Sequence, residues 1–131
     1  MELKLGSQNE HMPPQPLNIL IVDDHAEMRQ LIRSMLSDLA SEVNECTDGS
    51  QALAAYREHI PDWVLMDIRM KELDGIDATR QLRAAFPEAR VIIISEMGNA
   101  AYRKAAQEAG ACAYVLKENL LTLPSMLRQM D

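Results

Sequence analysis

The sequence predicts a doubly wound α/β fold in which one five-stranded parallel sheet carries helices on both faces. Three observations support this prediction. Five short apolar runs recur along the chain, and a stretch with helical character separates each run from the next. Runs such as Val91–Ile94 are apolar at every position, whereas a strand with one exposed face would alternate, so both faces of the sheet must be covered.

The predicted elements follow one another from residue 17 onward. The apolar runs predict strands at Leu17–Val22, Glu42–Cys46, Trp63–Met66, Val91–Ile94 and Ala113–Leu116. Apolar residues spaced by three and four between Met28 and Leu39 predict a helix with one buried stripe. Weaker or alanine-rich helical patterns follow at Ser50–His59, Ile76–Phe86, Asn99–Ala109 and Leu120–Met130. Turn residues fall between these elements at Asp48-Gly49, Asp74-Gly75 and Ala109-Gly110.

The chain length and composition favour a single domain preceded by a short leader. With 131 residues, of which 47% are hydrophobic and 25% charged, the chain has the composition of one ordinary globular domain. Residues 1–16 contain Pro13, Pro14 and Pro16 and show no periodicity, so we interpret them as a flexible leader, in part a cloning remnant around His11. Residues 17–131 are the expected domain.

Charge, cysteine content and hydropathy exclude several classes of protein. A net charge of -7 would repel a phosphate backbone, so direct nucleic-acid binding is not expected. Cys46 and Cys112 lack the spacing of a paired-ligand site and indicate reduced thiols. No apolar run approaches the roughly 20 residues of a membrane-spanning helix, and the N-terminus lacks the pattern of a signal peptide. We therefore expect a cytoplasmic protein without a membrane partner.

Polar residues follow four of the five predicted strands. Ligands of such sheets bind beyond the carboxyl ends of the strands, which are marked here by Asp23-Asp24, Asp67, Ser95 and Lys117. Taken singly, each has an ordinary explanation: aspartate and serine cap helices and form turns, and lysine is usually exposed. Their convergence at one edge of the sheet favours a functional site instead.

The clustered acids predict a magnesium site with phosphoryl-transfer chemistry. Three neighbouring carboxylates repel one another unless a multivalent cation lies between them, and oxygen ligands favour Mg²⁺. One neutralised carboxylate can then attack phosphorus and form an acyl phosphate. Lys117 would place its charge on the phosphoryl oxygens, and the Ser95 hydroxyl would donate a hydrogen bond to them.

In combination and order, these motifs resemble the receiver domain of two-component response regulators over residues 17–130. The matching segments are Leu20-Ile21-Val22-Asp23-Asp24-His25, Asp67-Ile68-Arg69-Met70, Asp74-Gly75, Ser95, and Gly110-Ala111 leading to Tyr114-Val115-Leu116-Lys117. The resemblance implies a flavodoxin-like sheet with strand order 2-1-3-4-5. It also implies that Asp67 is the phosphoacceptor, that Asp24, Asp67 and the backbone carbonyl of Arg69 hold Mg²⁺, and that Asp23 acts through water.

The resemblance further implies a switch and a set of partners. Ser95 would move toward the phosphoryl group while Tyr114 turns inward, and Arg69 and Met97 would tune the lifetime of the phosphoaspartate. A sensor histidine kinase, a phosphotransfer protein or a small phosphodonor would supply the phosphoryl group. Such a domain is no ordinary enzyme, although it assists its own phosphotransfer and dephosphorylation. The output face would comprise the fourth helix, fifth strand and fifth helix, which could also join two copies in a homodimer.

Asp67-Ile68-Arg69-Met70 and Leu116-Lys117-Glu118 resemble the LuxR-type branch of the family, whose members reach DNA through an effector domain that this chain does not contain.

Two departures from the family pattern leave a second function open. Lys71-Glu72 replaces the usual proline and glycine beside Asp67, and Glu96 stands where a small residue is common. A pseudo-receiver that acts only by binding proteins is therefore an alternative. A haloacid-dehalogenase-type enzyme is disfavoured because Arg69 stands where its second acid would be. A nucleotide or flavin module is disfavoured because no glycine-rich loop follows the first strand.

Overall fold

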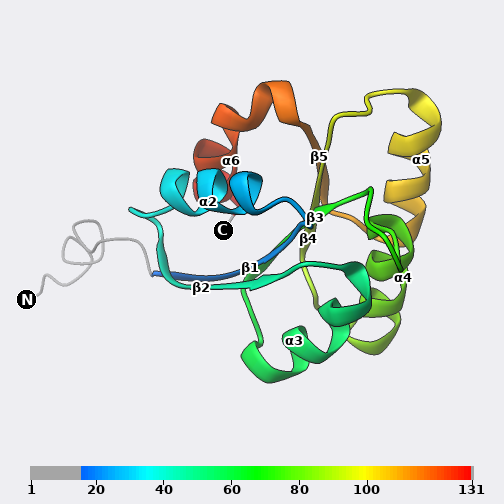
Figure 1. Ribbon diagram of the computed structural model, residues 1–131, viewed down its shortest axis with the longest axis horizontal. Helices are drawn as coiled ribbons and strands as arrows, with labels where there is room; N and C mark the ends of the chain where they lie inside the picture. Colours follow the sequence, from blue (N-terminus) through cyan, green and yellow to red (C-terminus); the bar gives the residue numbers. More distant parts are fainter. Residues whose placement is uncertain (1–15, 131) are drawn as a thin grey trace, which may run out of the picture.

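The computed structural model describes residues 16–130, so the predicted leader lies outside the described residues except for Pro16. Five parallel strands form one sheet in the order β2-β1-β3-β4-β5 (Figure 1). The strands are β1 (Leu17–Val22), β2 (Ala40–Cys46), β3 (Trp63–Asp67), β4 (Val91–Ser95) and β5 (Ala113–Leu116). The predicted fold class and strand order are confirmed.

Helices cover both faces of this sheet, and the strands alternate their side chains between two cores. The helices are α2 (Ala26–Met35), α3 (Ala52–His59), α4 (Gly75–Ala85), α5 (Ala100–Ala109) and α6 (Leu123–Met130), with short 3-10 turns η1 (Gly49–Gln51) and η2 (Lys117–Thr122). On β1, Leu20 packs with α3, α4 and α5, whereas Ile19 and Ile21 pack with α2 and α6. Because both faces of the central strands meet a core, β1, β3 and β4 are apolar at nearly every position, whereas the edge strand β2 is largely polar and exposed.

The observed boundaries differ from the predicted ones at both ends of the domain. The first helix was expected to reach Leu39, but it ends at Met35, and β2 begins at Ala40 because Leu17 pairs with Ala40 across a register irregularity. The last helix was expected from Leu120, but residues Lys117–Thr122 form a 3-10 turn in which Leu120 is buried. Within residues 16–130, no helix has the length and hydropathy needed to cross a membrane.

Candidate functional site

The strand register brings the predicted polar residues to one edge of the sheet. Val22 pairs with Met66, so Asp23 follows β1 where Asp67 ends β3. Asp67 in turn pairs with Ile94, and Ser95 pairs with Leu116, the residue before Lys117. Asp67 and Ser95 are the last residues of their strands, one position further than the apolar runs predicted.

Two buried carboxylates share a single lysine at this edge. The Lys117 Nζ lies 3.4 Å from Asp67 Oδ1 and 3.7 Å from Asp23 Oδ2. The side chains of Asp23 and Asp67 are only 2% and 5% exposed, so water cannot screen their repulsion. Burial, reinforced by the charge of Asp23 and opposed by Lys117, raises the pKa of Asp67 to about 6. The site therefore holds excess negative charge.

The arrangement of donor atoms fits a divalent cation. Asp23, Asp24, His25 and Asp67 each offer one ligand atom, and these atoms lie within 4.8 Å of one another. Asp67 Oδ2 is buried without a hydrogen-bond partner, which is costly unless a ligand satisfies it. Carboxylate oxygens are the ligands that Mg²⁺ prefers. The pocket also contains His25, to which sequence reasoning gave no role.

Met97 connects the two residues predicted to form the switch. Its backbone N–H donates to Ser95 Oγ at 3.0 Å, and its carbonyl accepts a hydrogen bond from the Tyr114 hydroxyl. Tyr114 is half-buried, and the Arg103 guanidinium lies 4.8 Å from the centre of its ring. Ser95 and Tyr114 are thus held by the same residue, although no position of the sequence pattern indicated this link.

The two predicted modulators with charged side chains lie at the rim of the site. Arg69 is exposed in the loop after β3, and Glu96 is exposed directly after Ser95. The backbone of Arg69 follows the buried Ile68, whose carbonyl accepts a hydrogen bond from the Gly75 N–H at 2.8 Å. The loop that carries Arg69 is therefore anchored at its start by the first residue of α4.

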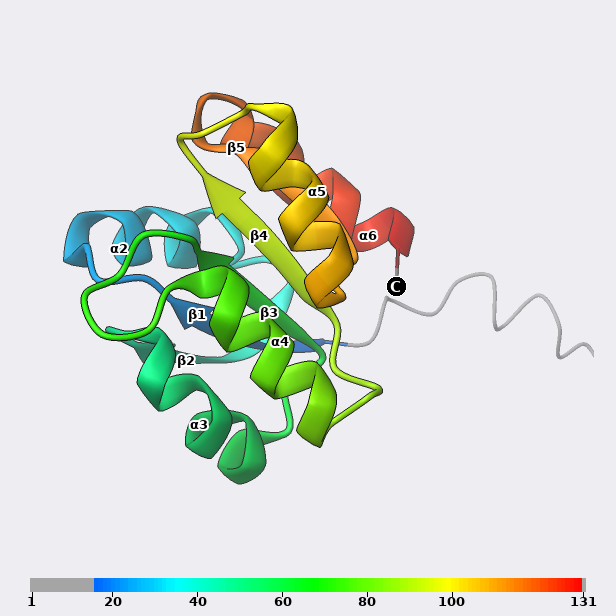
Figure 2. The same ribbon diagram turned by 90° about the vertical axis from the view of Figure 1, so that its right-hand side faces the viewer.

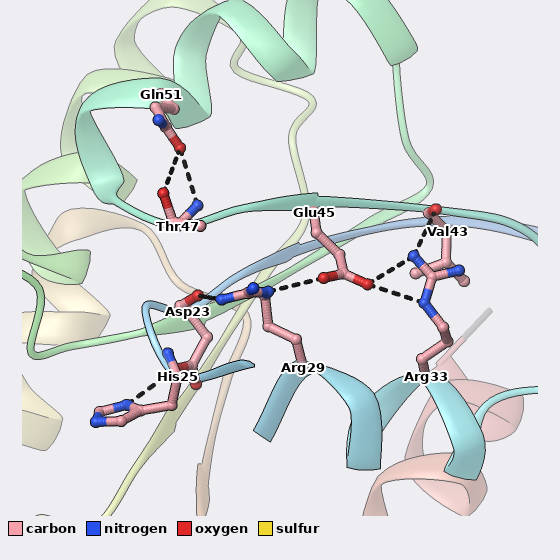
Figure 3. A network of polar contacts seen from close by, with 8 residues as sticks. All are labelled: Asp23, His25, Arg29, Arg33, Val43, Glu45, Thr47 and Gln51. Atoms are coloured by element: carbon pink, nitrogen blue, oxygen red, sulfur yellow. Dashed lines mark hydrogen bonds and ion pairs between the residues drawn. The ribbon is translucent and has the colours of Figure 1, made fainter. Parts of the chain in front are cut away.

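A salt-bridge network supports the backbone beside the acids (Figure 3). Arg29 on α2 donates through Nη1 to the Asp23 carbonyl at 2.9 Å and through Nε to Glu45 Oε1 at 2.7 Å. Arg33, one turn later, donates to Glu45 Oε2 at 2.6 and 2.8 Å. Burial acts to raise the pKa of Glu45, but the two guanidinium groups outweigh it and lower that pKa. Glu45 therefore stays ionised and holds Arg29 against the end of β1.

Asp48 joins the turn after β2 to the loop after β3. Its carboxylate accepts hydrogen bonds from the backbone N–H groups of Ser50 at 2.9 Å, Glu72 at 3.0 Å and Leu73 at 3.2 Å. Burial acts to raise the pKa of Asp48, but these donors outweigh it and lower the pKa to about 2. The sequence indicated only a turn at this position, because the Asp-Gly pair does not reveal which distant loop the carboxylate contacts.

Replacing Asp48 with asparagine is expected to lower the free energy of unfolding by about 1–2 kcal/mol, because an amide offers one oxygen for three N–H donors. A folded-state pKa below the ordinary value stabilises the protein above about pH 4, and this contribution is lost as the pH falls toward 2. Urea titrations at pH 7 and pH 3, with amide exchange of Glu72 and Leu73, measure both effects.

Asp74→Asn is the matched control for Asp48→Asn. Asp74 caps α4 by accepting the Asp77 N–H at 2.9 Å, and asparagine caps helices equally well. Its stability should change little. Unchanged amide exchange at Glu72 and Leu73 in Asp48→Asn would contradict the tethering role of Asp48.

Comparison with known proteins agrees with the geometry of the site. The family model described as the response regulator receiver domain matches residues 19–128. The chain belongs to this receiver family. It is 43% identical over 100 residues to the chemotaxis protein CheY of Bacillus subtilis, a match that covers 76% of this chain and 83% of that protein.

Solved structures of receiver domains have the same architecture. A LuxR-family two-component response regulator from Aurantimonas sp. SI85-9A1 aligns with a TM-score of 0.83 at 32% identity, over 88% of this chain and 85% of that chain. A chain of the CheX–CheY–BeF3–Mg²⁺ complex from Borrelia burgdorferi aligns with a TM-score of 0.79 at 28% identity, over 88% of this receiver and 89% of that chain. The predicted family, including its likeness to LuxR-type regulators, is confirmed.

Proposed function

We propose that this receiver domain accepts a phosphoryl group on Asp67 and that Mg²⁺ is required for the transfer. The proposal rests on the environment of the Asp67 carboxylate. It is buried at the end of β3, one of its oxygens has no hydrogen-bond partner, and the other lies 3.4 Å from Lys117 Nζ. A carboxylate in this condition gains stabilisation from an added cation and from a phosphoryl group that Lys117 can bind.

The residues of this pocket fit the magnesium ion that the receiver family implies. Asp24, Asp67 and the backbone carbonyl of Arg69 would hold the ion, with Asp23 acting through water. When bound, Mg²⁺ would neutralise the carboxylates and the incoming phosphoryl oxygens. A chain of the CheX–CheY–BeF3–Mg²⁺ complex from Borrelia burgdorferi is 28% identical to this chain.

Apart from the metal, the transfer of the phosphoryl group requires only that Asp67, Lys117 and Ser95 are correctly placed around the phosphorus. An Asp67 oxygen attacks the phosphorus of a phosphohistidine or of a small phosphodonor such as acetyl phosphate. A P–O bond to Asp67 forms as the donor's P–N or P–O bond breaks, and the bonding electrons leave with the donor. Lys117, only 12% exposed, balances the charge on the phosphoryl oxygens, and Ser95 donates its hydroxyl to them.

The shared contacts of Met97 suggest how the site signals outward. When Ser95 Oγ turns to the phosphoryl group, it gives up the Met97 N–H that it accepts at 3.0 Å. Movement of Met97 then releases the Tyr114 hydroxyl from the Met97 carbonyl, and the Tyr114 ring turns inward. Helix α5 follows Met97, β5 contains Tyr114, and α6 follows β5 in the chain. These three elements lie together at one edge of the sheet (Figures 1 and 2). We propose them as the output face.

The partners and setting follow from this function. A sensor histidine kinase or phosphotransfer protein would donate the phosphoryl group in the cytoplasm. The output face would contact a target or a second copy of the chain, and DNA would be reached only through a separate effector domain. No metal or donor beyond Mg²⁺ and the phosphorylated partner is needed for this chemistry.

One titration tests the proposal against the pseudo-receiver alternative. Amide spectra are recorded with Mg²⁺ alone, with beryllium fluoride alone and with both together. Mg²⁺ alone is expected to shift amides at the metal site, such as that of Asp67. Shifts at Ser95 and Tyr114 are expected only in the mixture, because the fluoride mimics a phosphoryl group on an ionised carboxylate beside the metal. The single Trp63 is a poor reporter, because it begins β3 whereas Asp67 ends it. Asp67→Asn should abolish the response, and a parent that never responds would be a pseudo-receiver.

Glu96→Ala is expected to speed labelling by acetyl phosphate about two- to fivefold at low salt. Glu96 is exposed beside Ser95, and its charge repels an anionic donor approaching the site. Added salt should narrow the difference, since exposed charges are screened. The initial rate of phosphorylation, followed by intact-protein mass, measures the effect. The control is Glu108→Ala, which removes an exposed acidic residue on α5 and should leave the rate unchanged. Equal labelling rates for Glu96→Ala and the parent would show that Glu96 does not slow the approach of the donor.

A further inference from the structure

The His25 side chain turns toward the acidic pocket although most of it is exposed. Its Nδ1 lies 2.9 Å from Asp24 Oδ1 and 3.3 Å from Asp23 Oδ1, while 65% of the side chain is open to solvent. The backbone N–H of His25 also donates to Asp23 Oδ1 at 2.8 Å, which fixes the start of this turn (Figure 3). The imidazole Nδ1 therefore lies beside two carboxylates, and the backbone N–H of His25 binds one of them as well.

Capping of α2 does not explain this orientation. His25 occupies the N-cap position of α2, but its side chain makes no capping hydrogen bond to the first turn. An N-cap side chain normally accepts a hydrogen bond from the N–H two or three residues later. The ring instead points back to the carboxylates that precede it. The ring therefore contacts the acidic pocket and does not cap the helix.

The pocket offers a ligand set of three carboxylates and one imidazole. One ligand atom from each of Asp23, Asp24, His25 and Asp67 lies within 4.8 Å of the others, and the buried Asp67 Oδ2 has no hydrogen-bond partner. Bonds of about 2.1 Å to a six-coordinate ion place opposite ligands about 4.2 Å apart. The four ligand atoms are therefore close enough to converge on one ion after modest side-chain rotations.

We propose that His25 makes this pocket a binding site for Zn²⁺, which competes there with Mg²⁺. The inference rests on the proposed function only in that both ions use the same acids. Mg²⁺ prefers oxygen ligands and gains little from an imidazole, whereas imidazole suits Zn²⁺ and neighbouring transition metals, which also bind a given site more tightly. On binding Zn²⁺, Nδ1 gives up its 3.3 Å hydrogen bond with Asp23 Oδ1, and the ring carries its proton on Nε2.

Calorimetric titration of the metal-free protein with ZnCl2 and with MgCl2 tests the proposal. We expect His25→Ala to weaken Zn²⁺ binding by about tenfold or more and Mg²⁺ binding by less than about twofold. His25→Gln, which keeps a polar side chain without an imidazole, should behave as His25→Ala does. Because His25 is exposed, neither variant is expected to disturb folding.

His59→Ala is the matched control, because His59 is a second histidine that lies near an acidic side chain. His59 Nδ1 lies 3.8 Å from Glu42 Oε2, without the buried carboxylates of the pocket. This variant should bind Zn²⁺ as the parent does. Imidazole ¹⁵N spectra add a direct readout, because Zn²⁺ should shift Nδ1 of His25 and leave His59 unchanged.

Competition between the two metals locates the Zn²⁺ site. Saturating Mg²⁺ should weaken the apparent affinity for Zn²⁺, whereas zinc held by the exposed Cys112 thiol would be insensitive to Mg²⁺. Unchanged Zn²⁺ affinity in His25→Ala would overturn the proposal, and so would Zn²⁺ binding that Mg²⁺ does not oppose in a parent that does bind Mg²⁺. Failure of the parent to bind Mg²⁺ would overturn the proposed function instead, and the direct Zn²⁺ titration would still decide the role of His25.

Discussion

Replacing Asp67 with asparagine is expected to raise the free energy of unfolding by about 2–3 kcal/mol at pH 7.5 in metal-free buffer. The pKa of Asp67 is raised from 3.8 to about 6 in the folded protein, so folding at neutral pH forces a charge into a site that resists it. Asparagine has nearly the same shape and no charge. Lys117 keeps a partner in this variant, because its Nζ also lies 3.7 Å from Asp23 Oδ2.

The pH dependence of the Asp67→Asn effect has a definite sign. Below about pH 4 both the folded and the unfolded parent carry a protonated Asp67, so the substitution does not raise the free energy of unfolding. Between about pH 4 and pH 6 the unfolded state loses its proton first, so the stability of the parent falls relative to the variant as the pH rises. Above about pH 6 the difference is constant. Urea titrations of both proteins from pH 4 to pH 8 measure it.

Two controls separate the Asp67 effect from a general change of charge. Asp38→Asn removes an exposed carboxylate and should leave stability within about 0.5 kcal/mol of the parent. Saturating Mg²⁺ should stabilise the parent more than Asp67→Asn, because the ion binds the carboxylate that the variant lacks. A destabilised Asp67→Asn at pH 7.5 would show that repulsion does not dominate this pocket.

The sequence was sufficient to predict the fold because the three central strands, β1, β3 and β4, are buried on both faces. An apolar residue at each position of Val91–Ile94 has few alternatives to a central parallel strand, and the order of the elements then limits the topology. The same regularity predicted the site, since parallel strands present their carboxyl ends at one edge. Asp23, Asp67 and Lys117 were found by their place at strand ends, and the structure brings them together.

Contacts between loops could not be predicted in the same way. Asp48 reaches the N–H groups of Glu72 and Leu73 across more than twenty residues of chain, and no periodicity encodes such a contact. Arg29 lies on the polar face of a helix, where a charged residue is usually only solvated. The pairing of β2 beside β1 is what brings Glu45 to Arg29. These contacts depend on the completed fold rather than on local sequence.

Gly75→Ala is expected to lower the free energy of unfolding by about 2–3 kcal/mol and to slow phosphorylation of Asp67. Gly75 is the first residue of α4, and replacing glycine by alanine inside a helix ordinarily stabilises the helix, by about 1 kcal/mol at interior positions. The sign of the change is therefore diagnostic. A Cβ added at Gly75 would overlap the Asp67 carbonyl oxygen and lie 2.7 Å from the Asp67 carbonyl carbon and 2.9 Å from Met66 Cγ. Two of these three neighbours are backbone atoms of the phosphoacceptor.

Relief of this overlap must move either α4 or the end of β3. The Gly75 N–H donates to the Ile68 carbonyl at 2.8 Å, so a displaced α4 would also pull the loop that carries Arg69. Gly98→Ala is the matched control, because its added Cβ would meet only the end of the Leu116 side chain, at 3.0 Å, which can rotate away. Urea denaturation gives the stability of both variants, and acetyl phosphate labelling gives their activity. If Gly75→Ala were as stable as the parent, the close contact of α4 with the Asp67 backbone would not be a constraint on the site.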